Sequence, residues 1–265
     1  MKITVFSAVF FCLALMTAQA RAGEMGADEI ASRASRVSYY QGADGRSEVT
    51  MVITDSQGRQ RQRSMTILRK NVGEGGEQKY YVYFHKPADV KGMSYIVWKH
   101  AGNKDDDRWL YLPALDLVKR IASSDKRSSF AGSTFLYEDI SGRSIELDTH
   151  ELVKSGDGYY ELKNTPRDAA SVEFSYYTVT IDAANFVPRR AEYYDKEGKP
   201  YRIIEALEVG EIQGFATITK MKAVDLNSGG STVAEFSNIS YNVGLGEDIF
   251  TERYLRKPPI QWLKE

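Results

Sequence analysis

The sequence predicts a mainly β fold made of one large antiparallel sheet. From residue 48 onward, many short runs alternate with a period of two, which is the period of a strand. Short clusters rich in glycine, asparagine, aspartate and serine separate these runs. Connections this short leave no room for helical crossovers, so neighbouring runs are expected to pair antiparallel. A sheet of roughly a dozen strands must curl or split. A barrel, a half-barrel and a sandwich are therefore the candidate architectures.

The chain begins with the pattern of an export signal. A lysine precedes the apolar run 3–16, and Ala20 and Ala22 follow at cleavage-type spacing. We therefore expect residues 1–22 to be a signal peptide, cleaved near Ala20 to Ala22, and residues 23–265 to form a single β domain. The apolar run is shorter than the roughly 20 residues that a spanning helix needs. An exported, soluble protein is expected.

Composition excludes several classes of protein. The only cysteine, Cys12, lies inside the predicted signal, so the mature chain has no disulfide, cysteine nucleophile or thiolate metal site. A packed core must then provide the stability. The formal net charge is −1, which argues against a nucleic-acid partner. The 17 tyrosines suit strands and surfaces that are apolar at one end and wet at the other.

The predicted elements follow in chain order. Residues 27–37 open with two acidic residues and space their apolar residues at helical intervals, which predicts one short amphipathic helix. Runs 48–54 and 63–70, joined by the turn 55–58, predict a hairpin. The further strand-like runs are 79–85, 94–100, 108–112, 117–121, 145–154, 158–163, 172–182, 187–194, 201–208, 215–224 and 231–241.

Two segments interrupt the strand rhythm. Residues 122–142 are rich in serine and glycine, yet they carry three aromatic residues. A long connection of this kind is expected either to fold over the mouth of the sheet as a lid or to pack against a sheet edge. Near the end of the chain, residues 246–250 predict the start of a short helix that Pro258 and Pro259 stop.

Candidate catalytic and metal-binding groups are sparse. The three histidines stand apart from other ligand residues in the sequence, which favours structural or surface roles. No G-x-S-x-G elbow is present, so an exported hydrolase is the weakest hypothesis. The acidic run 105–107 invites a calcium interpretation, but the glycine and glutamate that complete a calcium loop are missing. A solvated hairpin tip is the favoured interpretation.

Neither the glycine groups nor the basic runs define a ligand site by themselves. Glycines at 73–76 and 229–230 lead into strands and are expected to form turns, not a phosphate cradle. The basic runs 59–63 and 119–127 are candidate contacts for anionic head groups or an acidic partner. Solvated faces are the more common explanation of such runs.

Several strands are apolar on both alternating faces, so something must cover the second face. Tyr81 and Tyr83, for example, alternate with Val82 and Phe84. Either the sheet folds onto itself, or the second face lines an apolar cavity that the amino-terminal helix and residues 122–142 close. The predicted cavity-lining residues are Met51, Ile53, Met65, Ile67, Tyr81, Tyr83, Ile96, Trp98, Leu110, Leu112, Phe130 and Phe135. An error of one residue in strand facing would exchange the two candidate sets.

Three segments resemble a known family. Residues 84–92 resemble its F-x-x-P-x-D-x-K-G pattern, residues 108–115 its W-L-Y-L-P-A-L pattern, and residues 129–139 its S-F-x-G-S-D-F-x-Y-E-D pattern. The family is the exported outer membrane lipoprotein-sorting family, a distant LolA-like group. Thr134 departs from it, because the family pattern usually has aspartate there. This departure removes a carboxylate from the segment 122–142.

The resemblance implies an incomplete β-barrel: a strongly curved antiparallel sheet with a few short helices packed in its concave side. It also implies an apolar cavity for acyl chains, a place in the periplasm of a double-membrane bacterium, and a role in outer membrane biogenesis. Members of the family often look like accessories of inner-membrane exporters of the resistance-nodulation-division type, so such an exporter is an expected partner.

These observations favour a non-enzymatic, periplasmic carrier or binding protein for lipid or lipoprotein acyl chains. Each acyl methylene hidden from water contributes about 0.8 kcal/mol, so a free lipid needs a shield to cross an aqueous compartment. Apolar side chains supply that shield without a cofactor. The alternative is a non-catalytic docking or scaffold module for an exporter, with a solid interior and no bound lipid.

Overall fold

The computed structural model describes residues 25–73, 76–102 and 104–263. The predicted signal peptide lies outside these ranges. Within them, no helix combines the length and the apolar character that crossing a membrane requires.

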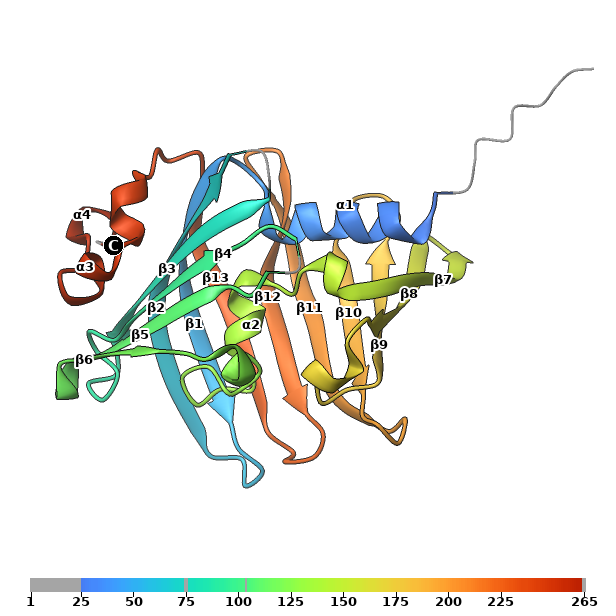
Figure 1. Cartoon of the computed structure of the whole chain (residues 1–265), viewed down its shortest axis with the longest axis horizontal. Helices are drawn as coiled ribbons and strands as arrows, with labels where there is room; N and C mark the ends of the chain where they lie inside the picture. Colours follow the sequence, from blue (N-terminus) through green and yellow to red (C-terminus); the bar gives the residue numbers. More distant parts are fainter. Residues whose placement is uncertain (1–24, 74–75, 103, 264–265) are drawn as a thin grey trace, which may run out of the picture.

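All the described strands belong to one antiparallel sheet of 13 strands (Figure 1). They are β1 (Asp44–Thr54), β2 (Gln60–Val72), β3 (Glu77–Lys86), β4 (Ser94–Lys99), β5 (Asp107–Leu112), β6 (Leu117–Arg120), β7 (Asp148–Gly156), β8 (Tyr159–Pro166), β9 (Tyr176–Asp182), β10 (Pro188–Tyr194), β11 (Pro200–Ile212), β12 (Phe215–Asp225) and β13 (Ser231–Tyr241). Their spatial order is β6-β5-β4-β3-β2-β1-β13-β12-β11-β10-β9-β8-β7. Two meanders are thus joined where β1 pairs with β13, and the sheet is not closed.

The sheet curls strongly, and the predicted incomplete barrel is confirmed. Its two free edges are β6 and β7, which are neighbours in the sequence. Of the three candidate architectures, the half-barrel is the one that forms. The predicted hairpin is also present, because β1 pairs with β2 from Thr54 opposite Gln60 back to Asp44 opposite Lys70. The run predicted from residue 145 begins with a 3-10 turn, η3 (Ile145–Leu147), and β9 starts four residues later than the run predicted from 172.

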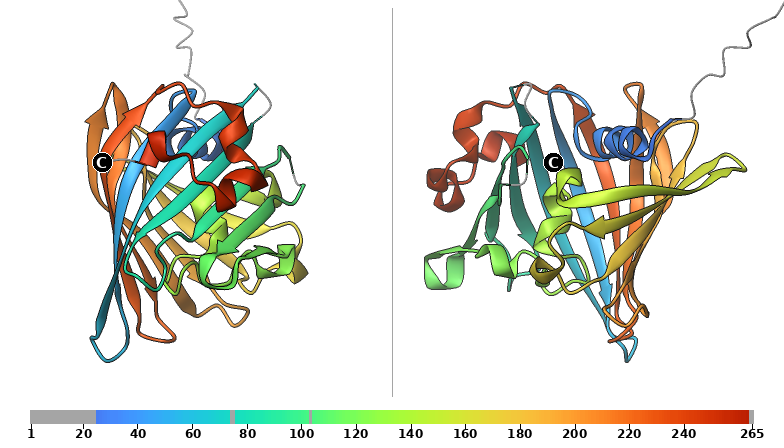
Figure 2. Two further views of the ribbon diagram at one scale, coloured as in Figure 1. Left: turned by 90° about the vertical axis from the view of Figure 1, so that its left-hand side faces the viewer. Right: turned by 45° about the vertical axis from the view of Figure 1, so that its right-hand side comes forward.

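Helix α1 (Ala27–Tyr39) lies inside the curve of the sheet (Figures 1 and 2). It packs on β7, β8 and β12. Asp28 and Glu29 in its first turn and Arg36 in its last turn match the helix dipole. Its apolar face, which includes Ile30 and Ala34, is buried against β8 and β9. The amphipathic pattern of the sequence thus directs one face of the helix towards the sheet.

The connection between β6 and β7 also enters the concave side. It contains η2 (Ser123–Asp125), α2 (Tyr137–Ser141) and η3. The Phe130 ring lies 5.7 Å from the Phe84 ring and 5.5 Å from the Tyr95 ring. Thr134 fastens the connection to the sheet, since its hydroxyl donates to the Ala223 carbonyl over 2.9 Å. The connection is therefore part of the core, where the sequence had predicted a lid over the mouth or a contact at an edge.

The carboxyl-terminal segment covers the convex face of β2 to β5. It consists of η5 (Glu247–Phe250), α3 (Glu252–Arg256) and α4 (Ile260–Leu263). Figure 2 shows this red segment outside the sheet, on the side away from α1. Phe250 and Leu255 are buried against this face, and the Trp98 indole donates to the Phe250 carbonyl over 2.6 Å. The expectation that the helices lie in the concave side thus fails for these three, because β3 and β4 are apolar on both faces and need a cover outside.

The remaining 3-10 turns are η1 (Pro113–Leu115), between β5 and β6, and η4 (Ala169–Ser171), before β9. The segment after β13 is tied to the sheet by the buried Asp44, whose carboxylate accepts the backbone N–H groups of Val243 over 2.6 Å and Leu245 over 2.7 Å. These bonds direct the chain from the end of β13 to the convex face.

We predict that Phe250→Ala lowers the free energy of unfolding by about 3 to 5 kcal/mol, because it opens a cavity beneath the carboxyl-terminal segment. The measurement is urea unfolding followed by tryptophan fluorescence. Ile260→Ala is the matched control in the same segment, since Ile260 is 49% exposed. Its effect should stay within about 0.5 kcal/mol. Equal losses in the two variants would contradict the packing described for this face.

Candidate functional site

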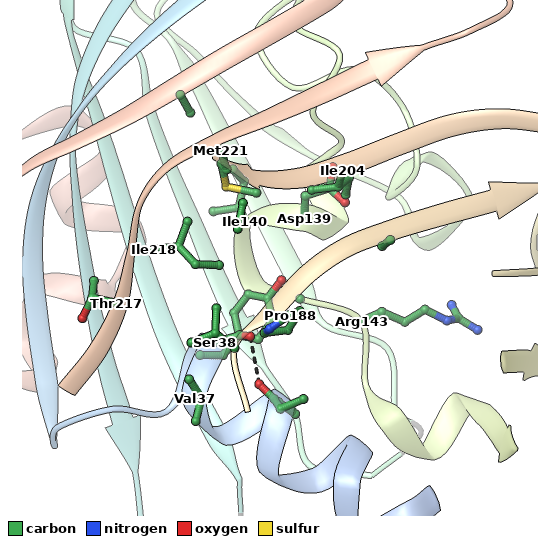
Figure 3. Close-up of a pocket in the computed structure, with 18 of the residues that line it drawn as sticks. Val37, Ser38, Asp139, Ile140, Arg143, Pro188, Ile204, Thr217, Ile218 and Met221 are labelled. Carbon is green, nitrogen blue, oxygen red and sulfur yellow. Dashed lines mark hydrogen bonds between the residues drawn. The ribbon is translucent and has the colours of Figure 1, made fainter. Parts of the chain in front are cut away.

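A cavity of about 400 Å³ lies between the concave face of the sheet, α1 and α2. Figure 3 shows Ile140, Ile204, Ile218 and Met221 gathered across from Val37 and Ser38 of α1. Small-molecule pockets in proteins have volumes of roughly 300 to 1,000 Å³. Apolar side chains form most of the wall; they include Val49, Met51, Met65, Ile67, Ile140, Leu162, Val179, Ile181, Ile204, Ile218, Met221 and Phe236.

The cavity follows from the width of the sheet. A barrel of about eight strands has an interior that side chains can just fill, and wider sheets enclose more space. Here 13 strands curl around one helix and one connection, which do not fill the interior. Small side chains on the concave face add to the space. Ala234, for instance, stands between Met51 and Met221 in the strand register.

Buried ion pairs hold α2 at one end of the cavity. Glu138 accepts from Arg127 over 2.6 Å and from Arg143 over 3.4 Å, and Arg143 also donates to Asp148 over 2.9 Å. Burial opposes the ionisation of Glu138, but the two arginines outweigh it and hold the pKa of this carboxyl below its usual value. Arg143 points away from the apolar side chains in Figure 3. This network positions α2, and its charged groups are paired with one another where they reach the cavity wall.

Lys99 joins the end of α1 to the end of α2. Its buried ammonium donates to the Ser141 carbonyl over 2.6 Å and to the Gly142 carbonyl over 3.2 Å. The same group lies 5.3 Å from the centre of the Tyr39 ring. Burial lowers the pKa of Lys99 to about 8. Gly142 has a φ of 75°, and a Cβ there would lie 2.5 Å from the Tyr39 ring, so only glycine fits at this contact.

The predicted lining residues divide into three groups. Met51, Met65, Ile67, Phe130 and Phe135 lie on the cavity wall. Leu110 and Leu112 pack in the concave core without reaching the wall, and Ile53 borders a separate hollow near the β1–β2 turn. Tyr81, Tyr83, Ile96 and Trp98 lie on the convex face, under the carboxyl-terminal segment.

The strand register shows that the predicted direction of the four side chains on the convex face was wrong. Tyr80 stands opposite Arg69, and Val82 opposite Ile67, so the even-numbered residues of β3 face inward. The pattern could not reveal this, because both alternating sets of β3 and β4 are apolar. Ligand binding by the five wall residues stays a prediction.

Sequence reasoning missed most of the wall. β8 to β13 contribute residues such as Leu162, Val179, Ile204, Met221 and Phe236. Alternation along β11, where Ile204 and Ala206 both face the cavity, was the available signal. Helix α1 contributes Val37 as well.

The histidines and the acidic run take part in structural contacts. His100 Nε2 lies 2.9 Å from Asp107, and His150 Nδ1 lies 2.6 Å from the Asn164 side chain. His85 Nε2 lies 2.8 Å from the Thr66 hydroxyl.

The acidic run is not a solvated hairpin tip, as the sequence had suggested. The Asp106 side chain is only 11% exposed and pairs with Arg108 over 2.6 Å. Asp105 pairs with Lys126 over 2.9 Å. Among the described residues, no group of three or more histidine, cysteine, aspartate or glutamate side chains could hold a metal ion.

This chain is similar to one protein-family model and to several solved structures. A family model described only as an uncharacterized protein matches residues 76–257. A DUF1329 family protein from Desulfovibrio piger ATCC 29098 is 32% identical, over 85% of this chain and 96% of its own, with a TM-score of 0.79. No curated protein sequence matches significantly.

Two further structures share the fold. A domain from Vibrio parahaemolyticus, described as an outer membrane lipoprotein-sorting protein domain, is 28% identical, over 87% of this chain and 98% of its own, with a TM-score of 0.78. The LolA superfamily protein NE2245 from Nitrosomonas europaea is 21% identical, over 87% of this chain and 100% of its own, with a TM-score of 0.67. At that identity the last comparison concerns the fold alone.

We predict that Glu138→Gln lowers the free energy of unfolding by about 2 kcal/mol, because it removes the buried carboxylate that Arg127 and Arg143 share and leaves each arginine with one remaining carboxylate partner. Glu173→Gln is the matched control: its carboxylate also pairs with Arg127, but it is 48% exposed. That loss should stay below about 1 kcal/mol. Urea unfolding at neutral pH measures both, and similar losses would contradict a structural role specific to Glu138.

The same variants predict a pH dependence. The pKa of Glu138 is lowered in the folded protein, so its contribution is present above the unfolded value of 4.5 and is lost as the pH falls through the folded value. The stability difference between wild type and Glu138→Gln should therefore shrink as the pH falls below 4.5. Urea unfolding at a series of pH values measures it, and a constant difference would contradict the assignment.

Proposed function

The chain belongs to the DUF1329 family of LolA-like proteins, and on that premise we propose that it is a periplasmic carrier or binding protein for lipid or lipoprotein acyl chains. The observation that carries the proposal is the internal cavity of about 400 Å³ with its apolar wall. The similarity to a domain described as lipoprotein-sorting supports the same function. The export pattern of residues 1–22 supports the periplasm as its location.

The wall is suited to acyl chains in particular. Three methionines, Met51, Met65 and Met221, lie on it. Their unbranched, flexible side chains adapt to a ligand of variable shape. Aliphatic and aromatic residues complete the surface. Since each buried methylene contributes about 0.8 kcal/mol, a chain of ordinary length gains enough from such a wall to leave water.

We propose that binding proceeds without a chemical reaction or a cofactor. The charged groups next to the cavity at α2 are engaged with one another: Glu138 with Arg127 and Arg143, and Asp139 with Arg202. Groups held in such pairs fix the position of a helix and are poorly placed to exchange protons with a substrate. This supports a binding function.

Release of a cargo requires a second conformation. Both α1 and the connection that carries α2 contribute to the wall, so movement of either opens the cavity. Lys99 contacts both, through the Tyr39 ring and the Ser141 carbonyl. We infer that these two segments open together.

The docking or scaffold module is the second candidate function, and the cavity favours the carrier over it, because a module of that kind is expected to have a solid interior. An exporter of the resistance-nodulation-division type stays a predicted partner, on the resemblance of the sequence. A carrier and an exporter partner are compatible, since an exporter is one source or recipient of cargo.

We predict that the exported protein, purified without detergent, carries an acyl-chain lipid that mass spectrometry detects in the denatured extract. Ile204→Trp should reduce the amount of this lipid several-fold, because Ile204 lies on the cavity wall and the indole fills the space. Ile203→Trp is the matched control, since adjacent residues of a strand face opposite sides. It should keep the lipid. An empty protein that also fails to bind added fatty acid or phospholipid would favour the docking module.

A further inference from the structure

Arg69 of β2 lines the cavity as a cation without an ion pair. Four arginines lie on the wall. Arg46 pairs with Glu48 over 2.6 Å, Arg143 with Asp148 over 2.9 Å, and Arg190 with Glu192 over 3.1 Å. Among the ion pairs of the described residues, none involves Arg69. Arg69 thus differs from the other three arginines of the wall, each of which pairs with a carboxylate.

Neutral groups fix the Arg69 guanidinium in place. Nη1 donates to the Asn71 side-chain oxygen over 2.7 Å, and Nη2 donates to the Gln41 carbonyl. Asn71 is itself fixed, because its amide donates to the Gly42 carbonyl over 2.9 Å. These two acceptors use only part of the donor capacity of a guanidinium. The guanidinium is therefore held in one orientation, and these two hydrogen bonds leave other N–H groups of it for a ligand.

The carboxylate with an electrostatic effect on Arg69, that of Asp44, already has hydrogen-bond partners. Asp44 exerts an electrostatic influence on Arg69, but its carboxylate accepts the backbone N–H groups of Val243 and Leu245. The other groups that influence Arg69 are the neutral phenols of Tyr40, Tyr80 and Tyr241. Burial, the largest influence, lowers the pKa of Arg69. An arginine stays charged even so, and Arg69 is partly buried, where a charge without an opposite partner is costly.

The position of Arg69 divides the cavity into a polar end and an apolar body. Around it the wall carries Gln41, Tyr80, Thr217 and Tyr241. Ile67 and Met65 follow on the same face of the same strand. From Arg69 to Met65 the strand spans about 13 Å. A polar head at the arginine and an aliphatic chain along β2 match this arrangement.

We infer that Arg69 binds the oxyanion of an amphiphilic ligand, a carboxylate or a phosphate, whose acyl chain lies along Ile67 and Met65. The inference rests on the proposed function and narrows its ligand to lipids with an anionic head group next to the chain. A guanidinium binds such oxyanions through paired, charge-assisted hydrogen bonds. The ligand then supplies the counter-charge that the protein lacks at this position.

The test is competition of three ligands with the same chain against a bound neutral fluorescent lipid: dodecanoate, dodecyl phosphate and dodecan-1-ol. We expect at least one of the two anions to bind about tenfold more tightly than the alcohol, as charge-assisted hydrogen bonds predict. Arg69→Gln should reduce this ratio to about one, and Arg69→Lys should keep part of it. Arg59→Gln removes a charge at the exposed end of the same hairpin and should keep the full ratio.

The outcomes separate the two proposals. Equal affinities for anions and alcohol in the wild type, or a ratio that persists in Arg69→Gln, overturn the role of Arg69 and leave the carrier standing. Failure of the fluorescent lipid and of all three ligands to bind in direct titration overturns the carrier itself, whereas binding of the fluorescent lipid without competition by any of the three overturns only the role of Arg69. Inorganic phosphate is tested as a fourth competitor. If it acts at a concentration similar to that of dodecyl phosphate, the site binds a free anion and the inference of a lipid head group is wrong. The wild-type ratio does not depend on how well a variant folds.

Discussion

A 13-stranded sheet that curls without closing encloses more space than its own side chains can fill, and this constraint shapes the protein. The pairing of β1 with β13 sets the constraint, because it joins two meanders into one sheet and leaves β6 and β7 as free edges. The chain responds by placing α1 and the connection between those edges inside the curve. They cover the inner face but leave a cavity. The proposed function thus arises from the geometry of the sheet.

Charge is distributed around this cavity according to position. Where α2 must be held, carboxylates and arginines are paired: Glu138 lies between Arg127 and Arg143. Between the helices, Lys99 uses backbone carbonyls and an aromatic ring in place of a carboxylate. At the polar end, Arg69 has neutral partners only. A protein interior leaves a cation without a counter-charge at a cost, and a ligand that supplies one removes it.

The two faces of the sheet pack against different parts of the protein. The inner face of β1, β2 and β8 to β13 lines the cavity, whereas the outer face of β2 to β5 is covered by the carboxyl-terminal segment. The cover stabilises the half of the sheet from which Tyr80, Met65 and Ile67 project inward. The carboxyl-terminal segment thus supports from outside the strands whose inner face forms this part of the cavity wall.

The strands, the hairpin turns and the amphipathic helix could be predicted from the amino-acid sequence, because hydrophobic periodicity and turn residues act locally. The sequence also identified five wall residues, among them Met51 and Phe130. The direction in which the side chains of β3 and β4 point could not be predicted in this way, because it depends on contacts made in the folded protein. Both of their faces are apolar, so the side covered by Phe250 and Leu255, far along the chain, settles which residues point inward. The same holds for Arg69: no local pattern reveals which of many arginines lacks a carboxylate, since ion pairs form between residues that only the fold brings together.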